Sequence, residues 1–198
     1  MNPDHGADSE PIGEFLELFE RARKQEATDH TAVALATADA EGQPSVRMVL
    51  LKGVDEEGFV FYTNYASRKA DELDSNPQAA LCFYWPAIGK QVRVEGTVER
   101  ISAEESDAYF ATRSHASRIG AWASRQSQAL ESRAQLVARV VRAEARFAGR
   151  EVPRPEFWGG YRLTPDRLEI WHNQLHRLHE RVVWKRHGDG WAKSRLYP

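Results

Sequence analysis

The sequence predicts an α+β protein, mainly β, in which short antiparallel strands form a barrel or sandwich with helices inserted between them. Two observations predict this class. Apolar residues alternate with other residues in about six to eight short segments, as in strands with one buried face. Other segments carry apolar residues at helical spacing, without the strand–helix alternation of parallel sheets. The chain also lacks a glycine-rich dinucleotide or P-loop fingerprint, which disfavours Rossmann and Walker folds.

The first half of the chain is expected to begin with a helix and continue mainly as strands. Phe15, Leu18 and Ala22 recur at helical spacing and predict an amphipathic helix over 13–27. Strands are expected over 33–37, 45–54, 59–63, 79–85 and 91–101, and a short helix over 69–73. Gly96 interrupts the last of these strands and indicates a β-bulge.

The second half is expected to contain two helices followed by more strands. Ser102 and Glu105 form a capping box that opens a helix through Phe110. A second amphipathic helix is expected over 130–147, stopped by the proline-rich segment 152–155. Strands are then expected over 160–163, 168–171, 182–185 and 191–196, the last two joined by a turn at 187–190.

Composition narrows the functional classes. The 198 residues suit a single domain over 12–198, preceded by a disordered tail over 1–11. With 27 basic and 29 acidic residues, the formal net charge of −2 does not favour nucleic-acid binding. No apolar stretch approaches the roughly 18 residues that span a bilayer, and residues 1–11 lack a signal-peptide core. We therefore expect a cytoplasmic protein with no membrane partner.

Two basic clusters are candidate anion sites. Arg47 and Lys52 flank an apolar strand, but strict alternation places them on opposite faces. A shared site would need a bulge, a twist or two ligands, and solvation of the strand ends is the simpler alternative. Arg68 and Lys69 open a helix after Ser67. Basic residues oppose the helix dipole there, which an anion bound between them would explain, but a solvated capped turn is an equal alternative.

Two further segments carry functional groups. Tyr109, Arg113 and Ser117 would share one face of a continuous helix and could hold a phosphate, although a solvated helix face is the alternative. Histidines at 172, 176 and 179 invite a zinc interpretation. The segment joins two strands and includes Arg177 and Arg181, which disfavours a metal. It is better interpreted as a loop that presents imidazole and guanidinium groups to an anionic, oxidisable substrate, with a plain polar connection as the alternative.

In this order, these segments resemble the pyridoxamine 5'-phosphate oxidase family, from about Phe15 to Pro198. The motifs that carry the resemblance are 47–52, 61–64 with 67–69, 119–127, 157–162 and 171–181, followed by the terminal Arg-Leu-Tyr-Pro. The resemblance implies an antiparallel, Greek-key-like FMN-binding split β-barrel with flanking α-helices. It also implies a homodimer with FMN between the subunits, and a dimerisation and substrate segment over 157–198.

The resemblance also implies roles for individual residues. FMN contacts from one subunit would be Arg47, Lys52, Tyr62, Thr63, Arg68, Lys69 and Gln91. The partner subunit would add Gln126, Ser127, Trp171 and Arg181. The substrate phosphate would be held by Lys52, Tyr109, Arg113 and Ser117, and the catalytic pair over the substrate ring would be Arg177 and His179.

The implied reaction is the FMN-dependent oxidation of pyridoxamine 5'-phosphate and pyridoxine 5'-phosphate by oxygen, giving pyridoxal 5'-phosphate and hydrogen peroxide. No metal is expected. The alternatives are a related flavin oxidase acting on a phenazine precursor, a non-catalytic flavin- or pyridoxal-phosphate-binding protein, and a β-barrel interaction module without a cofactor. The chain departs from the family pattern in the few polar residues before the first helix and in the segment 172–174, where a glycine-containing stretch is commoner.

Overall fold

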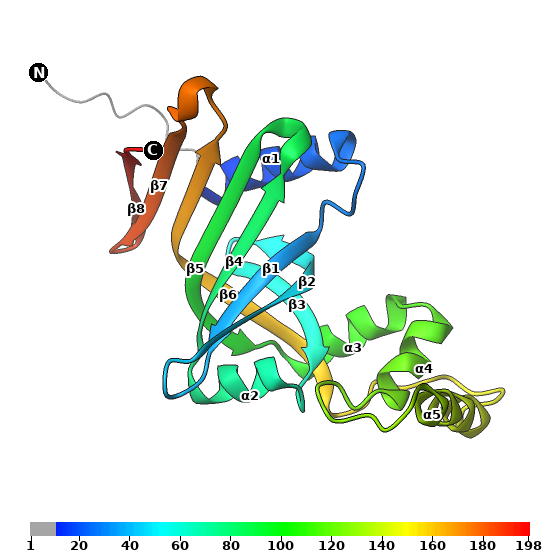
Figure 1. Ribbon diagram of the computed structural model, residues 1–198. Helices are drawn as coiled ribbons and strands as arrows, with labels where there is room; N and C mark the ends of the chain where they lie inside the picture. Colours follow the sequence, from blue (N-terminus) through cyan, green and yellow to red (C-terminus); the bar gives the residue numbers. More distant parts are fainter. Residues whose placement is uncertain (1–10) are drawn as a thin grey trace, which may run out of the picture.

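The computed structural model describes residues 11–198, which contain eight strands and five α-helices (Figure 1). In chain order the helices and strands are α1 (Pro11–Gln25), β1 (Ala32–Ala38), β2 (Pro44–Asp55), β3 (Gly58–Asn64), α2 (Arg68–Ser75), β4 (Gln78–Trp85), β5 (Lys90–Arg100), α3 (Ala103–Thr112), α4 (His115–Ala123), α5 (Arg133–Arg146), β6 (Trp158–His172), β7 (Glu180–His187) and β8 (Gly190–Leu196). Two 3-10 turns, η1 (Pro86–Ile88) and η2 (Leu175–Arg177), complete them.

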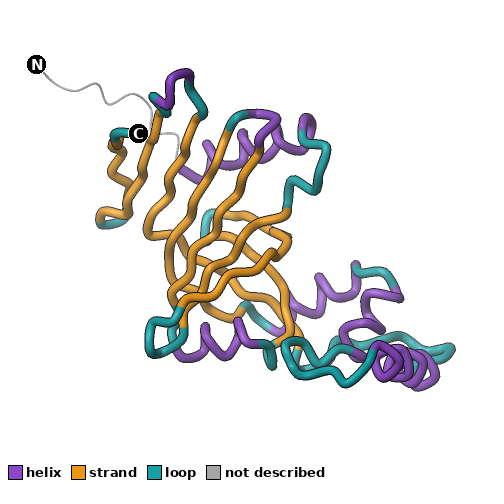
Figure 2. The backbone as a smooth tube through the Cα atoms, viewed as in Figure 1, coloured by secondary structure: helices purple, strands orange, loops and turns teal. Residues whose placement is uncertain are grey.

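The strands form one antiparallel sheet that closes into a barrel. Their spatial order is β3-β2-β1-β4-β5-β6-β7-β8, and β3 also pairs with β6. This extra pairing closes β3, β2, β1, β4, β5 and β6 into a six-stranded barrel, while β7 and β8 extend the sheet beyond β6 (Figure 2). The predicted class, mainly β with flanking helices around an antiparallel barrel, is therefore confirmed.

The barrel encloses the main hydrophobic core, and helices cover its ends. Inward residues such as Leu35, Phe61 and Val94 are fully buried. Phe15 of α1 packs edge-on against Phe59, with ring centroids 4.9 Å apart. Figure 1 shows α1 at one end of the barrel and α2 at the other. Apolar residues at helical spacing thus anchor α1 on the barrel, as its sequence predicts.

Two strands expected from the sequence, 160–163 and 168–171, are parts of one continuous strand, β6. The opposing strand β5 shifts register between Glu95 and Gly96, so the bulge expected at Gly96 is present. A Cβ added at Gly96 would lie 2.0 Å from the carbonyl oxygen of Thr164. Glycine is needed here because the backbones of β5 and β6 approach too closely for a side chain.

Replacing Gly96 with alanine is expected to lower the free energy of unfolding by about 2–4 kcal/mol, because the clash is with backbone that cannot move aside cheaply. Urea unfolding measures the change. Gly13→Ala is the matched control, since a Cβ there meets nothing within 4 Å and helix α1 favours alanine. Equal stability of the two variants would contradict the close approach.

The structure corrects one expectation about helices. Tyr109, Arg113 and Ser117 do not share one helix, because α3 ends at Thr112 and α4 begins at His115. The Ser114 hydroxyl caps α4 by accepting a hydrogen bond from the Ser117 backbone N–H, which starts a new helix in a new direction. The expected tail over 1–11 falls outside the described residues, except that Pro11 is buried as the first residue of α1.

Candidate active site

A cavity of about 970 Å³ opens at the rim of the barrel. It is bounded by β2, the end of β3, the start of α2, helices α3 and α4, and the loop after α4. Eleven of the predicted site residues line it: Arg47, Lys52, Tyr62, Thr63, Arg68, Lys69, Tyr109, Arg113, Ser117, Gln126 and Ser127. The pairing of β2 with β3 starts at Leu51, so residues 44–50 leave one strand edge open toward this cavity.

Arg47 and Lys52 both reach the cavity, although they lie on opposite faces of β2. The pairing of β2 with β3 shifts register between Leu51 and Gly53. A bulge of this kind is one of the features that a site shared by Arg47 and Lys52 was expected to need. Arg47 points toward α2, whereas Lys52 follows the outward side of the strand.

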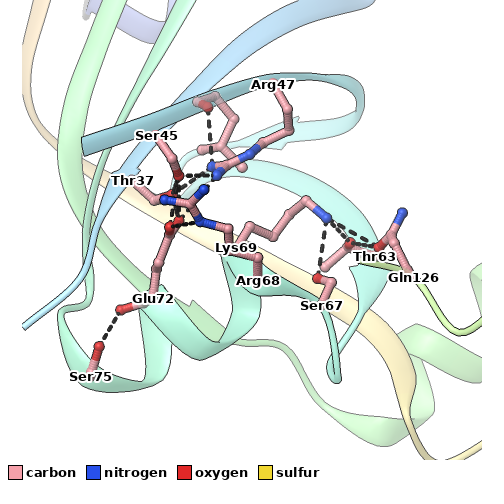
Figure 3. Close-up of polar contacts among 11 residues, drawn as sticks. Thr37, Ser45, Arg47, Thr63, Ser67, Arg68, Lys69, Glu72, Ser75 and Gln126 are labelled. Carbon is pink, nitrogen blue, oxygen red and sulfur yellow. Dashed lines mark hydrogen bonds and ion pairs between the residues drawn. The ribbon is translucent and has the colours of Figure 1, made fainter. Parts of the chain in front are cut away.

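Lys69 is held at the centre of a buried hydrogen-bond cluster (Figure 3). Its ammonium group donates to the hydroxyls of Thr63 at 3.0 Å and Ser67 at 3.1 Å, and to Gln126 Oε1 at 3.1 Å. Burial, and then the nearby charge of Arg47, lower the pKa of Lys69 to about 8, and Glu72 opposes this only in part. The site therefore holds a lysine whose charge changes close to neutral pH.

This lysine predicts a pH dependence of anion binding. A bound phosphate favours the charged form of Lys69, so binding takes up a proton once the pH exceeds about 8. The affinity for a phosphorylated ligand is expected to fall about tenfold between pH 7 and pH 9. Fluorescence titration of the flavin-free protein with FMN measures it, and Lys69→Met should remove most of the slope. A flat profile in the unaltered protein would contradict this assignment.

An aromatic wall forms another side of the cavity. The rings of Tyr62, Tyr109 and Trp158 lie nearly parallel, with centroids 3.9 Å apart for Tyr62 and Tyr109 and 5.4 Å apart for Tyr62 and Trp158. The guanidinium of Arg113 lies 4.7 Å above the ring of Trp158. Its buried Nη1 atom has no hydrogen-bond partner among residues 11–198, so it is free to bind an acceptor from a ligand. Planar rings beside an unpaired guanidinium nitrogen and a basic cluster fit a phosphorylated aromatic ligand such as FMN.

The structure places the remaining predicted residues elsewhere. Gln91, Trp171 and Arg181 are neighbours across β5, β6 and β7, and His179 packs on Trp171 with ring centroids 4.6 Å apart. Trp158 at the cavity and Trp171 lie at opposite ends of β6, about 40 Å apart along an extended strand. The resemblance implies that Gln91 acts with the residues that line the cavity, but within one chain it lies in this second cluster. Gln126 and Ser127, which the resemblance assigns to the partner subunit, line the cavity of their own chain.

Two loops, the one after α4 and the one between β6 and β7, contain residues with left-handed backbone conformations. Among residues 11–198, three residues other than glycine have positive φ: Ser127 at 70°, His176 at 56° and Arg177 at 61°. Such conformations are costly and gather at functional sites. The backbone N–H of Gln174 donates to Nδ1 of His179 at 3.2 Å, so the neutral ring carries its proton on Nε2. Two of these three residues, Ser127 and Arg177, are predicted site residues.

Sequence reasoning missed residues in the cavity and beside it. Trp158 gave no signal of its own beside the other tryptophans. Glu72 did carry a signal, since it follows Arg68 by one helical turn on α2. Within residues 11–198, no group of three histidine, cysteine or acidic side chains is arranged to hold a metal ion. In the same part of the chain, every helix is too short or too polar to cross a bilayer.

The closed antiparallel barrel with this basic, aromatic cavity defines an FMN-binding split-barrel protein. Residues 19–147 match the family model described as pyridoxamine 5'-phosphate oxidase. Residues 158–198 match the one described as pyridoxine 5'-phosphate oxidase C-terminal dimerisation region. The chain therefore belongs to the pyridoxamine 5'-phosphate oxidase family, and it is an FMN-dependent oxidoreductase.

Relatives support this assignment over nearly the whole chain. A pyridoxine/pyridoxamine 5'-phosphate oxidase of Rubrobacter xylanophilus is 54% identical over 195 residues, covering 98% of this chain and 90% of the relative. The enzyme of that name from Anaeromyxobacter dehalogenans is 55% identical and covers 96% of each. The crystal structure of PhzG from Burkholderia lata, in complex with tetrahydrophenazine-1-carboxylic acid, superposes with a TM-score of 0.92 at 32% identity, covering 100% of this chain and 98% of that one. An FMN-binding protein of Nostoc punctiforme shares the fold, with a TM-score of 0.74 at 18% identity over the full length of both chains.

Proposed function

We propose that the protein oxidises pyridoxamine 5'-phosphate and pyridoxine 5'-phosphate with oxygen, giving pyridoxal 5'-phosphate and hydrogen peroxide. The observation that carries this proposal is that one cavity contains two separate sets of cationic and hydroxyl groups. One set lies at the start of α2, and the other lies on α3, on α4 and at Arg113 between them, beside the aromatic wall. Two sets suit a phosphorylated cofactor together with a phosphorylated substrate.

The first set would hold the phosphate of FMN. Arg68 and Lys69 stand at the N-terminus of α2, where backbone N–H groups add to the attraction for an anion. The flavin would extend from there along the open edge of β2. The remaining contacts in the cavity would come from Arg47, Lys52, Tyr62, Thr63, Gln126 and Ser127.

The second set would hold the substrate phosphate. Arg113 offers a buried nitrogen that has no hydrogen-bond partner in the described part of the chain, and burial lowers the pKa of Arg113 without removing its charge. The hydroxyls of Tyr109 and Ser117 and the ammonium of Lys52 line the same cavity. These neutral and cationic donors are the groups that bind a phosphate dianion.

Arg177 and His179 would act on the substrate ring. FMN, when bound, supplies the two-electron oxidation at the 4'-carbon of the substrate. Arg177 would orient the substrate ring, and His179 would present its Nε2 proton to a ring substituent. An amine substrate yields ammonia by hydrolysis of its oxidised form, whereas an alcohol substrate yields the aldehyde directly.

These two residues lie in the loop beyond the far end of β6, too distant to reach the cavity of their own chain, so we propose that a second copy supplies them. Trp171, Arg181 and Gln91 would accompany them to the FMN of the partner in a homodimer. Leu175 and Leu178 in the same loop are 80% and 68% exposed, which suits a contact with another subunit. The family's dimerisation region covers this loop.

Product analysis tests the proposal. The FMN-loaded protein should convert pyridoxamine 5'-phosphate to pyridoxal 5'-phosphate with one equivalent of peroxide. Pyridoxamine without its phosphate should react at least about 100-fold less efficiently, because charged hydrogen bonds to the phosphate are lost. Equal kcat/KM for pyridoxamine 5'-phosphate and pyridoxamine would contradict the assignment of Arg113 to the substrate phosphate.

The structural similarity to PhzG favours a second candidate, oxidation of a reduced phenazine carboxylate. That ligand has a carboxylate in place of a phosphate, so it uses fewer of the donors gathered around Arg113. Turnover of tetrahydrophenazine-1-carboxylic acid at a higher kcat/KM than pyridoxamine 5'-phosphate would favour this candidate over the main proposal.

A further inference from the structure

We propose that Glu72 is a positioning residue for the flavin phosphate site, in which its buried carboxylate fixes the guanidinium groups of Arg47 and Arg68. The inference deepens the proposed function and rests on the assignment of Arg68 and Lys69 to the phosphate of FMN. Glu72 belongs to α2 and lies behind Arg47 and Arg68, which line the cavity while Glu72 itself does not, so it would act through the arginines without touching the cofactor (Figure 3).

The side chain of Glu72 is 5% exposed. Its carboxylate receives hydrogen bonds from the two strands β1 and β2 and from its own helix α2. Oε2 accepts from the Thr37 hydroxyl of β1 at 2.5 Å and from Nη2 of Arg47 at 3.0 Å. Oε1 accepts from Nε of Arg68 at 2.7 Å, and both oxygens accept from the Ser45 hydroxyl. These bonds leave the carboxylate fully occupied, so its position is fixed with respect to both arginines.

The two arginines are held in different ways. Arg47 is enclosed by acceptors, since it also donates to Thr37, to Ser45 and to the backbone carbonyl of Leu35. Arg68 is 60% exposed and contacts Glu72 through Nε alone among residues 11–198. Its two terminal nitrogens make no hydrogen bond within the described part of the chain, so both can bind an acceptor from a ligand. A guanidinium fixed by its inner edge presents both outer nitrogens to a phosphate, which is the bidentate geometry that binds phosphate best.

Glu72 also balances the charge of the site. Burial acts to raise the pKa of Glu72, but the hydrogen bonds from Ser45, Thr37, Arg68 and Arg47 outweigh it and lower the pKa to about 2. The carboxylate is therefore ionised at neutral pH. Together with the cations of Arg47, Arg68 and Lys69, it leaves two net positive charges, which match a phosphate dianion.

The competing explanation is that Glu72 only ties α2 to β1 and β2. A structural tie would affect every ligand of the cavity, whereas a positioning residue for the phosphate site affects ligands with a phosphate. Riboflavin shares the ring system and ribityl chain of FMN and lacks the phosphate. The ratio of the two affinities therefore separates the explanations.

The test is the binding of FMN and riboflavin to flavin-free full-length protein, followed by flavin fluorescence. Glu72→Gln should weaken FMN binding about tenfold and change riboflavin binding less than twofold. Asp74→Asn is the matched control, because it makes the same chemical change on the same helix, at a carboxylate that pairs with Arg100 outside the cavity. It should leave both affinities unchanged.

A second variant does not depend on a buried substitution. Arg68→Lys keeps the charge at an exposed position but loses the Nε–H bond to Glu72, so it should also weaken FMN binding about tenfold. Adding Glu72→Gln to the Arg68→Lys variant should weaken FMN binding much less than Glu72→Gln does in the unaltered protein. This loss of additivity would not be expected if the two residues acted independently.

The outcomes separate the inference from the function on which it rests. Equal losses for FMN and riboflavin in Glu72→Gln, or unchanged FMN binding in either variant, would overturn the positioning role. If the unaltered protein bound FMN no better than riboflavin, the phosphate assignment of Arg68 and Lys69 would itself be wrong. A phosphate-specific loss in both variants, with the control unchanged, supports the inference.

Discussion

Arg177→Ala is expected to lower kcat/KM for pyridoxamine 5'-phosphate by at least about 100-fold while the protein keeps its FMN. Arg177 would orient the substrate ring, and misplaced reacting groups slow a reaction by this order. The backbone of Arg177 has a φ of 61°, a conformation that is unfavourable for a residue with a side chain and that is typical of functional positions. Steady-state kinetics and the flavin absorbance of the purified variant measure the two effects.

The control for this variant is Arg186→Ala, which removes an exposed guanidinium from the adjoining strand β7. It should leave kcat/KM within about twofold. Arg177→Ala with full activity would show that the substrate site is assigned wrongly. A mixture of Arg177→Ala and Arg113→Ala subunits should regain about a quarter of the activity, because each mixed dimer has one intact site. No recovery on mixing would contradict a site shared between two copies.

Arg68→Ala combined with Lys69→Ala is expected to weaken FMN binding by at least about 100-fold. Each residue would contribute a charged hydrogen bond to the phosphate, and such bonds are worth about 1.5–3 kcal/mol each. The ratio of flavin to protein after gel filtration, and titration of the flavin-free variant with FMN, measure the loss.

A double variant with the same change in net charge is the control for this prediction. Arg23→Ala with Lys24→Ala removes two cations from the last turn of α1, away from the cavity. FMN retention there should equal that of the unaltered protein. If both double variants retained FMN equally, the phosphate would have to lie elsewhere in the cavity.

The strands could be predicted from the sequence because each has a local signature. Alternating apolar residues define β1 and β5, and Asp55 to Gly58 form the turn between β2 and β3. Closure of the barrel has no local signature, because the pairing of β3 with β6 joins residues about a hundred positions apart. Only the family resemblance implies it. The break between α3 and α4 was missed, although Ser114 is a residue type that often begins a helix.

The candidate site was predictable where functional groups are clustered along the chain. Arg68 and Lys69 stand together at a helix start, and the resemblance then added Tyr62 and Gln126 from other elements. Glu72 was missed because its partners Thr37 and Ser45 come from distant strands, and their meeting depends on the closed barrel. The separation of the cavity from the Trp171 cluster is likewise a property of the folded chain, since it follows from the length of β6.

The most direct test of the proposed oxidation is the absorbance spectrum of the FMN-loaded protein before and after anaerobic addition of pyridoxamine 5'-phosphate. We expect a flavin spectrum that bleaches on addition and returns when air is admitted, with pyridoxal 5'-phosphate and peroxide formed. A flavin spectrum that stays unchanged after addition of the substrate would contradict the proposed oxidation.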